Sequence, residues 1–80
     1  MSFAFPGRIL EEYMIRNHRL GLVEFKGAAP GESQRPVFLD LVPEAHVGDF
    51  VLVHVGFATQ RVPEEEALRA SEPLTEHKPN

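Results

Sequence analysis

The run FVLVHV, residues 50–55, constrains the fold more than any other part of this sequence. All of its residues except His54 are apolar, and valine and phenylalanine favour β-strands. Successive side chains of a strand point to opposite faces, so Val51, Val53 and Val55 share one face while Phe50, Leu52 and His54 share the other. Both faces are apolar, so we expect the second face to be covered by the N-terminal arm, by a helix or by another protein.

Other strands are predicted on both sides of this run. Pro6-Gly7 is expected to punctuate the start, after a short apolar arm. Arg8–Ile15 fits a strand or a short helix, but Gly7 before it and Asn17-His18 after it favour a strand that leads into a hairpin turn. The remaining predictions are a returning strand at Leu20–Phe25, a loop at Gly27–Pro36, a strand at Val37–Leu41, a tight connection at Pro43–Asp49, and a bent continuation or fifth strand at Phe57–Val62.

A short helix is predicted to follow the last strand. Pro63 suits a first helical position, and Glu64, Glu65 and Glu66 complement the positive end of the helix dipole. Pro73 ends the helix, and the segment after it is mostly polar. We therefore expect one domain over residues 1–72 and a disordered tail over residues 73–80.

This order of elements predicts a mainly all-β fold. The chain has 80 residues, enough for one small core, and it has no cysteine for disulfides. Short antiparallel strands must bury one face, and closing the sheet removes its edges. We expect a small antiparallel β-barrel of the oligonucleotide/oligosaccharide-binding (OB) type with a short C-terminal α-helix.

The charge pattern argues against nucleic acid and membrane partners. The net charge is −4, and the eight Lys and Arg residues are scattered, whereas nucleic-acid binding needs a basic surface. No apolar run is long enough to span a membrane, and the N-terminus does not resemble a secretory signal. We expect a cytoplasmic protein. A barrel that binds single-stranded nucleic acid through stacking aromatics is the less favoured alternative.

Residues that could carry chemistry are few. His54 alone defines neither a metal site nor a mechanism, and it could simply be a half-buried histidine bonded to a backbone carbonyl. The run of glutamates at 64–66 fits a solvated start of a helix. No phosphate loop and no nucleophile with its base is present, and a metal-dependent or CO2-handling enzyme would need further ligands near His54. An interaction module is favoured over an enzyme.

Several segments taken together resemble the HypC/HupF family of [NiFe]-hydrogenase maturation chaperones. They are Pro6-Gly7, the run LDLVP at 39–43, the run VGDFVLVHVGFA at 47–58, and EEEA at 64–67. The resemblance extends to about Ala70. Its G-D-[FY]-V-L-V-H-x-G-F-A core is the specific part of the pattern.

The resemblance implies a scaffold without enzymatic activity. Such proteins carry an Fe(CN)2(CO) group transiently, bind the iron-sulfur protein HypD, and then bind the precursor of the hydrogenase large subunit. No tightly bound cofactor is implied. Their site residues are an N-terminal Cys in the pattern M-C-x-x-x-P-G and the His that corresponds to His54. We expect partner contacts from the N-terminal arm and the strongest strand: Phe3, Phe5, Pro6, Gly7, Phe50, Leu52, Gly56, Phe57 and Ala58.

The chain departs from the family pattern at Ser2, which occupies the position of the Cys. A thiolate is a soft anionic ligand for iron, whereas a serine hydroxyl stays protonated near neutral pH. Three explanations stay open: a paralogue that only binds proteins, coordination through the N-terminal amine, or an engineered replacement. The helix is also shorter than is usual in the family, and the loop Gly27–Pro36 is longer.

Overall fold

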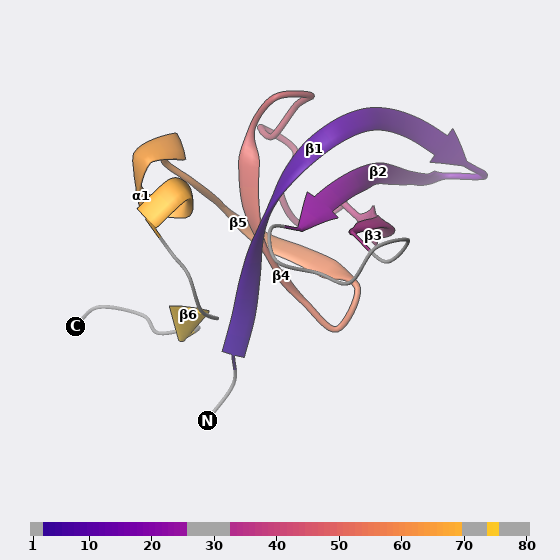
Figure 1. Cartoon of the computed structure of the whole chain (residues 1–80). Coiled ribbons are helices and arrows are strands. Elements are labelled where there is room, and N and C mark those ends of the chain that lie inside the picture. Colours follow the sequence, from indigo (N-terminus) through magenta and orange to yellow (C-terminus); the bar gives the residue numbers. More distant parts are fainter. Residues whose placement is uncertain (1–2, 26–32, 70–73, 76–80) are drawn as a thin grey trace.

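The computed structural model describes residues 3–25, 33–69 and 74–75, and they form mainly strands. In chain order the elements are β1 (Phe3–Ile15), β2 (His18–Phe25), β3 (Gln34–Phe38), β4 (Phe50–His54), β5 (Phe57–Val62), α1 (Glu64–Arg69) and β6 (Leu74–Thr75). Figure 1 shows β1 as the longest strand, curving across the molecule, with α1 to one side. Ser2 and residues 27–32 of the loop predicted at Gly27–Pro36 lie outside the described residues.

Five strands close into a barrel. The sheet order is β2-β3-β5-β4-β1-β6, and β1 also pairs with β2, which closes the ring. This confirms the predicted small barrel with a short C-terminal helix. One detail differs, because β3 and β5 pair in parallel, through the single pair Phe38–Phe57. The prediction of an entirely antiparallel sheet is wrong at this pair. The connection 39–49 leads into β4, and the hairpin after β4 then reverses the chain, so β5 runs in the same direction as β3.

The first strand begins earlier than predicted, at Phe3. Pro6 and Gly7 were expected to interrupt the chain, but they pair with Leu52 and Val51 of β4 inside the strand. Gly7 also pairs with Phe25 of β2, so β1 is paired on both sides there. A side chain at Gly7 would have no room, since a Cβ atom would lie 2.4 Å from Cγ1 of Val23. Gly7 is therefore required by close packing and does not mark the end of an element.

The barrel interior is a single apolar cluster. Its members come from all five barrel strands and from the connection 39–49: Ile9, Val23, Val37, Leu39, Val42, Ala45, Val51, Val53 and Ala58. The predicted inward face of β4 is thus confirmed for Val51 and Val53. Val55 is not part of it, because β4 ends at His54 and Val55 lies in the turn that follows.

The second face of β4 is covered by the protein's own chain. Leu52 is buried in a smaller cluster with Ala4, Val62 and Ala67, and Phe50 packs against this cluster. The helix α1 and the start of β1 therefore cover this face, as two of our three alternatives proposed. Because Leu52 is 3% exposed, an accessible apolar surface at Leu52 is ruled out.

Three other boundaries differ from the sequence predictions. The strand predicted at Val37–Leu41 begins at Gln34 and ends at Phe38. Residues 39–41 instead enter the connection to β4, with Leu39 buried. Leu74 and Thr75, placed by prediction in a disordered tail, form β6 and pair with Ala4 and Phe3. No helix in the described part of the chain is long and apolar enough to cross a membrane.

Candidate partner-binding site

The hairpin that joins β4 to β5 carries the motif histidine at its tip. His54 pairs with Phe57 as the last pair of the two strands, and Val55 and Gly56 form the turn between them. Val55 has φ 50° and Gly56 has φ 81°. Two positive φ angles in a two-residue turn are the signature of the type I′ hairpin, whose twist matches that of the strands. Gly56 accordingly meets a conformational requirement of this turn.

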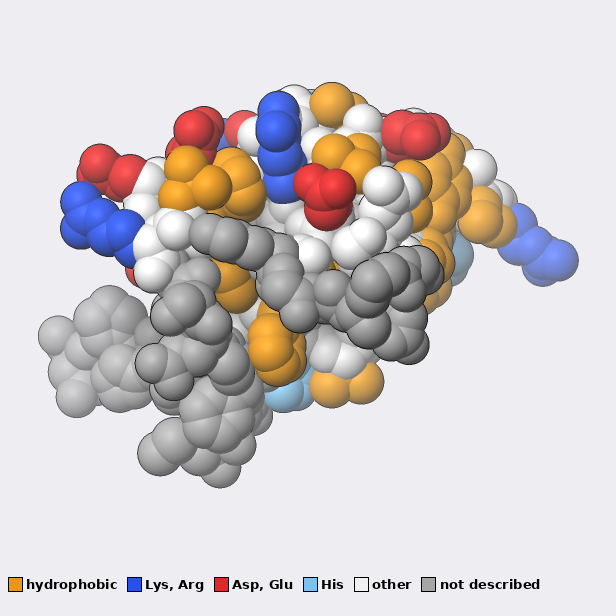
Figure 2. Space-filling view, in the orientation of Figure 1, with side chains coloured by type: hydrophobic (Ala, Val, Ile, Leu, Met, Phe, Trp, Pro, Cys, Tyr) orange, Lys and Arg blue, Asp and Glu red, His pale blue; other side chains and the backbone are white. Residues whose placement is uncertain are grey.

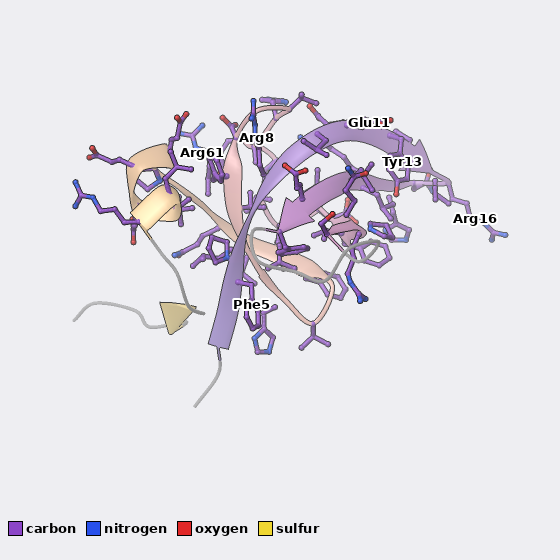
Figure 3. All side chains as sticks on the ribbon, viewed as in Figure 1. Phe5, Arg8, Glu11, Tyr13, Arg16 and Arg61 are labelled. Carbon is purple, nitrogen blue, oxygen red and sulfur yellow. The ribbon has the colours of Figure 1, made fainter. Side chains whose placement is uncertain are left out.

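An exposed apolar surface surrounds this turn. Phe5 of β1 pairs with Val53, next to His54 in β4. Phe5 is 51% exposed, Phe57 43% and Val55 83%, while His54 is partly exposed. We call Phe5, His54, Val55 and Phe57 the hairpin surface. Figure 3 places Phe5 at the lower end of β1, and the described side chains visible at the lower end of Figure 2 are hydrophobic or His.

Aromatic contacts extend the hairpin surface toward β2. The ring of Phe57 stacks on Phe38 with 5.0 Å between centroids. Phe38 in turn meets the edge of His18, with 5.9 Å between centroids. His18 Nδ1 lies 2.9 Å from a carboxylate oxygen of Asp40. The hairpin tip is thus held against β3 and the start of β2, and Phe57 is fixed in position by its neighbours.

The predicted site residues divide into accessible and buried groups. Phe5, Gly56 and Phe57 are exposed, and Pro6, Phe50 and His54 are partly exposed. Gly7, Leu52 and Ala58 are buried, so they support the surface from within. The side chain of Phe3 and the whole of Ser2 lie outside the described residues. His54 is partly exposed, as expected, and it follows Val53, which is the partner of Phe5 in β1.

A polar cluster that sequence reasoning missed holds the connection 39–49 in place. The Arg19 guanidinium donates to Glu12 Oε1 from Nη2 at 2.7 Å and from Nε at 3.1 Å. It also donates to the carbonyl oxygens of Val42, at 3.2 Å, and of Ala45. Glu12 Oε2 accepts a hydrogen bond from the backbone N–H of Val47 at 2.9 Å. No local sequence pattern links these residues, because their pairing depends on the barrel register.

Hydrogen bonds in this region lower the pKa of two carboxyl groups. Hydrogen bonds from the Arg19 side chain, and then from the Val47 backbone, lower the pKa of Glu12 below its ordinary 4.5. The backbone N–H of Arg19, and then the His18 side chain, lower the pKa of Asp40 below its ordinary 3.8. A carboxyl group with a lowered pKa in the folded state stabilises the fold above its unfolded pKa, and this contribution is lost as the pH falls through the folded value.

We expect the Glu12→Gln variant to be less stable than the wild type at neutral pH and to lose less stability on acidification. The neutral amide cannot form the charged pair with Arg19, so part of the acid-sensitive contribution is already absent. His46, whose Nδ1 lies 3.5 Å from Glu12 Oε2, adds to the pairing when protonated. Urea unfolding between neutral pH and about pH 3 measures the difference. Glu11→Gln, which removes the same charge at an exposed neighbour, is the control, and parallel pH profiles for Glu12→Gln and wild type would contradict the prediction.

The described residues do not form a metal site. No group of three His, Asp or Glu side chains in the described ranges is placed to hold a metal ion. His54 is the only potential ligand on the hairpin surface, and the chain has no cysteine. An iron group bound at this surface as cargo would therefore need donors in addition to His54.

The protein is a small closed barrel with a C-terminal helix, an exposed apolar hairpin tip and a motif histidine beside that tip. A model of the HupF/HypC family matches residues 1–74. The hydrogenase maturation factor HypC of Synechocystis sp. is 39% identical over 69 residues, covering 84% of this chain and 84% of that protein. The HypC of Cupriavidus necator is 35% identical over 69 residues, covering 86% of this chain and 68% of that protein.

A third relative, the HypC of Helicobacter hepaticus, is 31% identical over 68 residues, which cover 84% of this chain and 70% of that protein. The chain belongs to the HupF/HypC family. The proteins of this family are maturation chaperones and not catalysts, which supports a role in hydrogenase maturation for this chain.

Proposed function

We propose that this chain is a scaffold in [NiFe]-hydrogenase maturation that binds a HypD-like iron-sulfur protein and the precursor of the hydrogenase large subunit. The observation that carries the proposal is the hairpin surface, where exposed apolar side chains surround the motif histidine. Exposure of Phe5, Val55 and Phe57 to water does not stabilise an isolated protein. The centre of a protein–protein interface, in contrast, is typically made of aromatic and apolar side chains.

The charge distribution supports a protein partner. Neither residues 3–7 nor residues 50–60 contain Asp, Glu, Lys or Arg, although a quarter of the whole chain is charged. Depletion of charged residues, combined with aromatic enrichment, is typical of the core of a protein–protein interface. A surface without cations has no means of neutralising phosphates, so it does not favour nucleic acid.

The proposal also concerns the iron group. We infer that Fe(CN)2(CO) is cargo that passes through the complex while this chain holds the two proteins together. His54 can offer an imidazole nitrogen or a hydrogen bond at the hairpin surface. Ser2 lacks the ionisable thiol that would complete a soft ligand pair, so we expect the wild-type chain to bind its partners without retaining iron after purification.

The test is binding of the purified chain to each purified partner, preceded by recovery of the complex from cells that make a [NiFe] hydrogenase. We expect His54→Ala to weaken at least one complex about tenfold or more, as loss of an interface hot spot does. Because His54 is partly exposed at the end of β4, the variant should keep the fold and the unfolding midpoint of the wild type.

His46→Ala is the matched control, since it removes another exposed histidine that lies outside the hairpin surface. It should bind like the wild type. An unfolded His54→Ala protein would show that His54 serves the core, as in the alternative interpretation from sequence. Recovery of neither partner with the wild-type chain would refute the proposed function.

A further inference from the structure

Val55 combines two properties that are each unfavourable for an isolated protein. Its backbone has φ 50°, in the left-handed region. β-Branched residues rarely adopt this region, because their branched Cβ crowds the backbone. Its side chain is also 83% exposed, more than any other large hydrophobic side chain in the described part of the chain. Val55 therefore strains the turn, and burial within this protein does not offset that strain.

The turn itself does not need valine. A type I′ turn with glycine in second position most favours asparagine or aspartate in the first, because these residues tolerate the left-handed region. The chain has the glycine, Gly56, with φ 81°. Asparagine at residue 55 would complete the preferred pair, and it would remove the exposed apolar group. A strained conformation at an exposed position points to a requirement from outside the protein.

We propose that Val55 is a specificity-determining anchor of the scaffold, which inserts into an apolar depression on the partner protein next to the contact made by His54. The proposal rests on the proposed function and names the residue that selects the partner. The hairpin presents Val55 at its outermost point, and the stacking of Phe57 on Phe38 holds the base of the hairpin in place. An anchor that is fixed before binding loses little conformational freedom when it inserts.

The partner protein contacts the hairpin surface through an apolar region, for three reasons. The hairpin surface is continuous with the motif histidine to which we assign partner contact. Formal charges are absent from residues 3–7 and 50–60. The two γ-methyl groups of Val55 offer shape and apolar area but no hydrogen bond. The site that receives Val55 on the partner protein is therefore a shallow apolar pocket. Discrimination by such a pocket depends on the size of one or two methyl groups.

The β1–β2 hairpin provides a matched control. Arg16 has φ 57°, close to the φ of Val55, in a second two-residue turn whose second residue, Asn17, does not have a positive φ. Figure 3 shows Arg16 at the tip of that hairpin, far along β1 from Phe5. Substitution by asparagine relieves the same kind of backbone strain at both positions. Only at Val55 does it also remove an apolar side chain from the hairpin surface.

The experiment compares Val55→Asn, Arg16→Asn and Val55→Ile with the wild type, using purified HypD-like protein and purified large-subunit precursor as probes. We expect both asparagine variants to raise the midpoint of thermal unfolding by a few degrees. We expect Val55→Asn to weaken binding of at least one partner about tenfold, the effect of removing an interface anchor. Arg16→Asn should bind like the wild type. Val55→Ile keeps the branched apolar side chain and should retain binding within a few fold.

The outcomes separate the two proposals. If the wild type binds a partner and Val55→Asn binds it equally well, the anchor role is overturned while the scaffold function stands. Equal weakening by Arg16→Asn, or no rise in the unfolding midpoint of Val55→Asn, would also overturn it. If the wild type binds neither partner, both proposals fall. The wild type could instead self-associate without binding either partner, and Val55→Asn could abolish that self-association. This result would assign the hairpin surface to a second copy of the chain and overturn the proposal of a different partner protein.

Discussion

Ser2→Cys is expected to convert a chain that retains no iron into one that carries an iron group with CN and CO ligands, when it is purified anaerobically with a HypD-like protein. The substitution replaces one oxygen atom by sulfur. A cysteine thiol can ionise near neutral pH and bind soft metal ions, whereas a serine hydroxyl cannot. His54 is unchanged in the variant, so the two donors of the family pattern would both be present. Iron content and the infrared bands of bound CN and CO measure the result.

The three possible results of the Ser2→Cys experiment have distinct meanings. Bands in the variant alone would support a carrier site that Ser2 disables. Bands in both proteins would contradict this prediction and assign the iron to His54 or to the terminal amine. Bands in neither, with the HypD complex still formed, would also contradict it and would favour a paralogue specialised for protein binding. His54→Ala in the Ser2→Cys background is the control, because it should reduce the bands if both donors hold the same group.

Gly7→Ala is expected to be the most destabilising single-methyl change in the barrel. The added Cβ atom would lie 2.4 Å from Cγ1 of Val23 and 3.0 Å from Cε1 of Phe25. Val23 is fully buried and is stiff about its first torsion angle, so it cannot turn away freely. Overpacking of this kind costs about 1–3 kcal/mol or more. Against a total of about 4–12 kcal/mol for a domain of this size, that loss is large.

Gly21→Ala is the comparison for Gly7→Ala, because its Cβ atom would meet Cδ1 of Leu39 at 2.8 Å. Cδ1 is the far end of a longer side chain that can rotate, so the cost should be smaller. Urea unfolding of both variants gives the midpoints and the dependence on urea. A Gly7→Ala midpoint equal to that of the wild type would contradict the packing of β1 against β2 described above.

The parts of the fold that the sequence predicts are those where local pattern and tertiary packing agree. Val51 and Val53 alternate with Leu52 in a run without breakers, and β4 forms there as expected. Pro63 and the three glutamates predict the start of α1 within one residue. The motif around His54 predicts the family, and it predicts which hairpin carries the candidate site.

The parts that sequence reasoning missed depend on contacts between distant residues. Pro6 was expected to punctuate the start of the chain and Pro36 to lie in a loop, yet both lie inside strands, paired with Leu52 and Leu22. Proline is tolerated where its missing N–H falls on an unpaired strand edge, and a linear sequence does not show which edges are paired. The contact between Arg19 and Glu12 and the strain at Val55 are likewise set by the register and by the type of turn.

The pairing of β1 with both β4 and β6 has a consequence for biosynthesis. β2 follows β1 directly, so their hairpin can form while later residues are still being added. At about 5–20 residues per second, synthesis of the roughly 60 residues between β1 and β6 takes several seconds. Phe5 lacks its partner Val53 until β4 is made, and Ala4 lacks its partner Leu74 until β6 is made. Leu52 has no α1 to cover it until the helix has followed β4 and β5. A nascent chain that stalls before α1 would therefore present unpaired strand edges and apolar side chains to quality-control proteases.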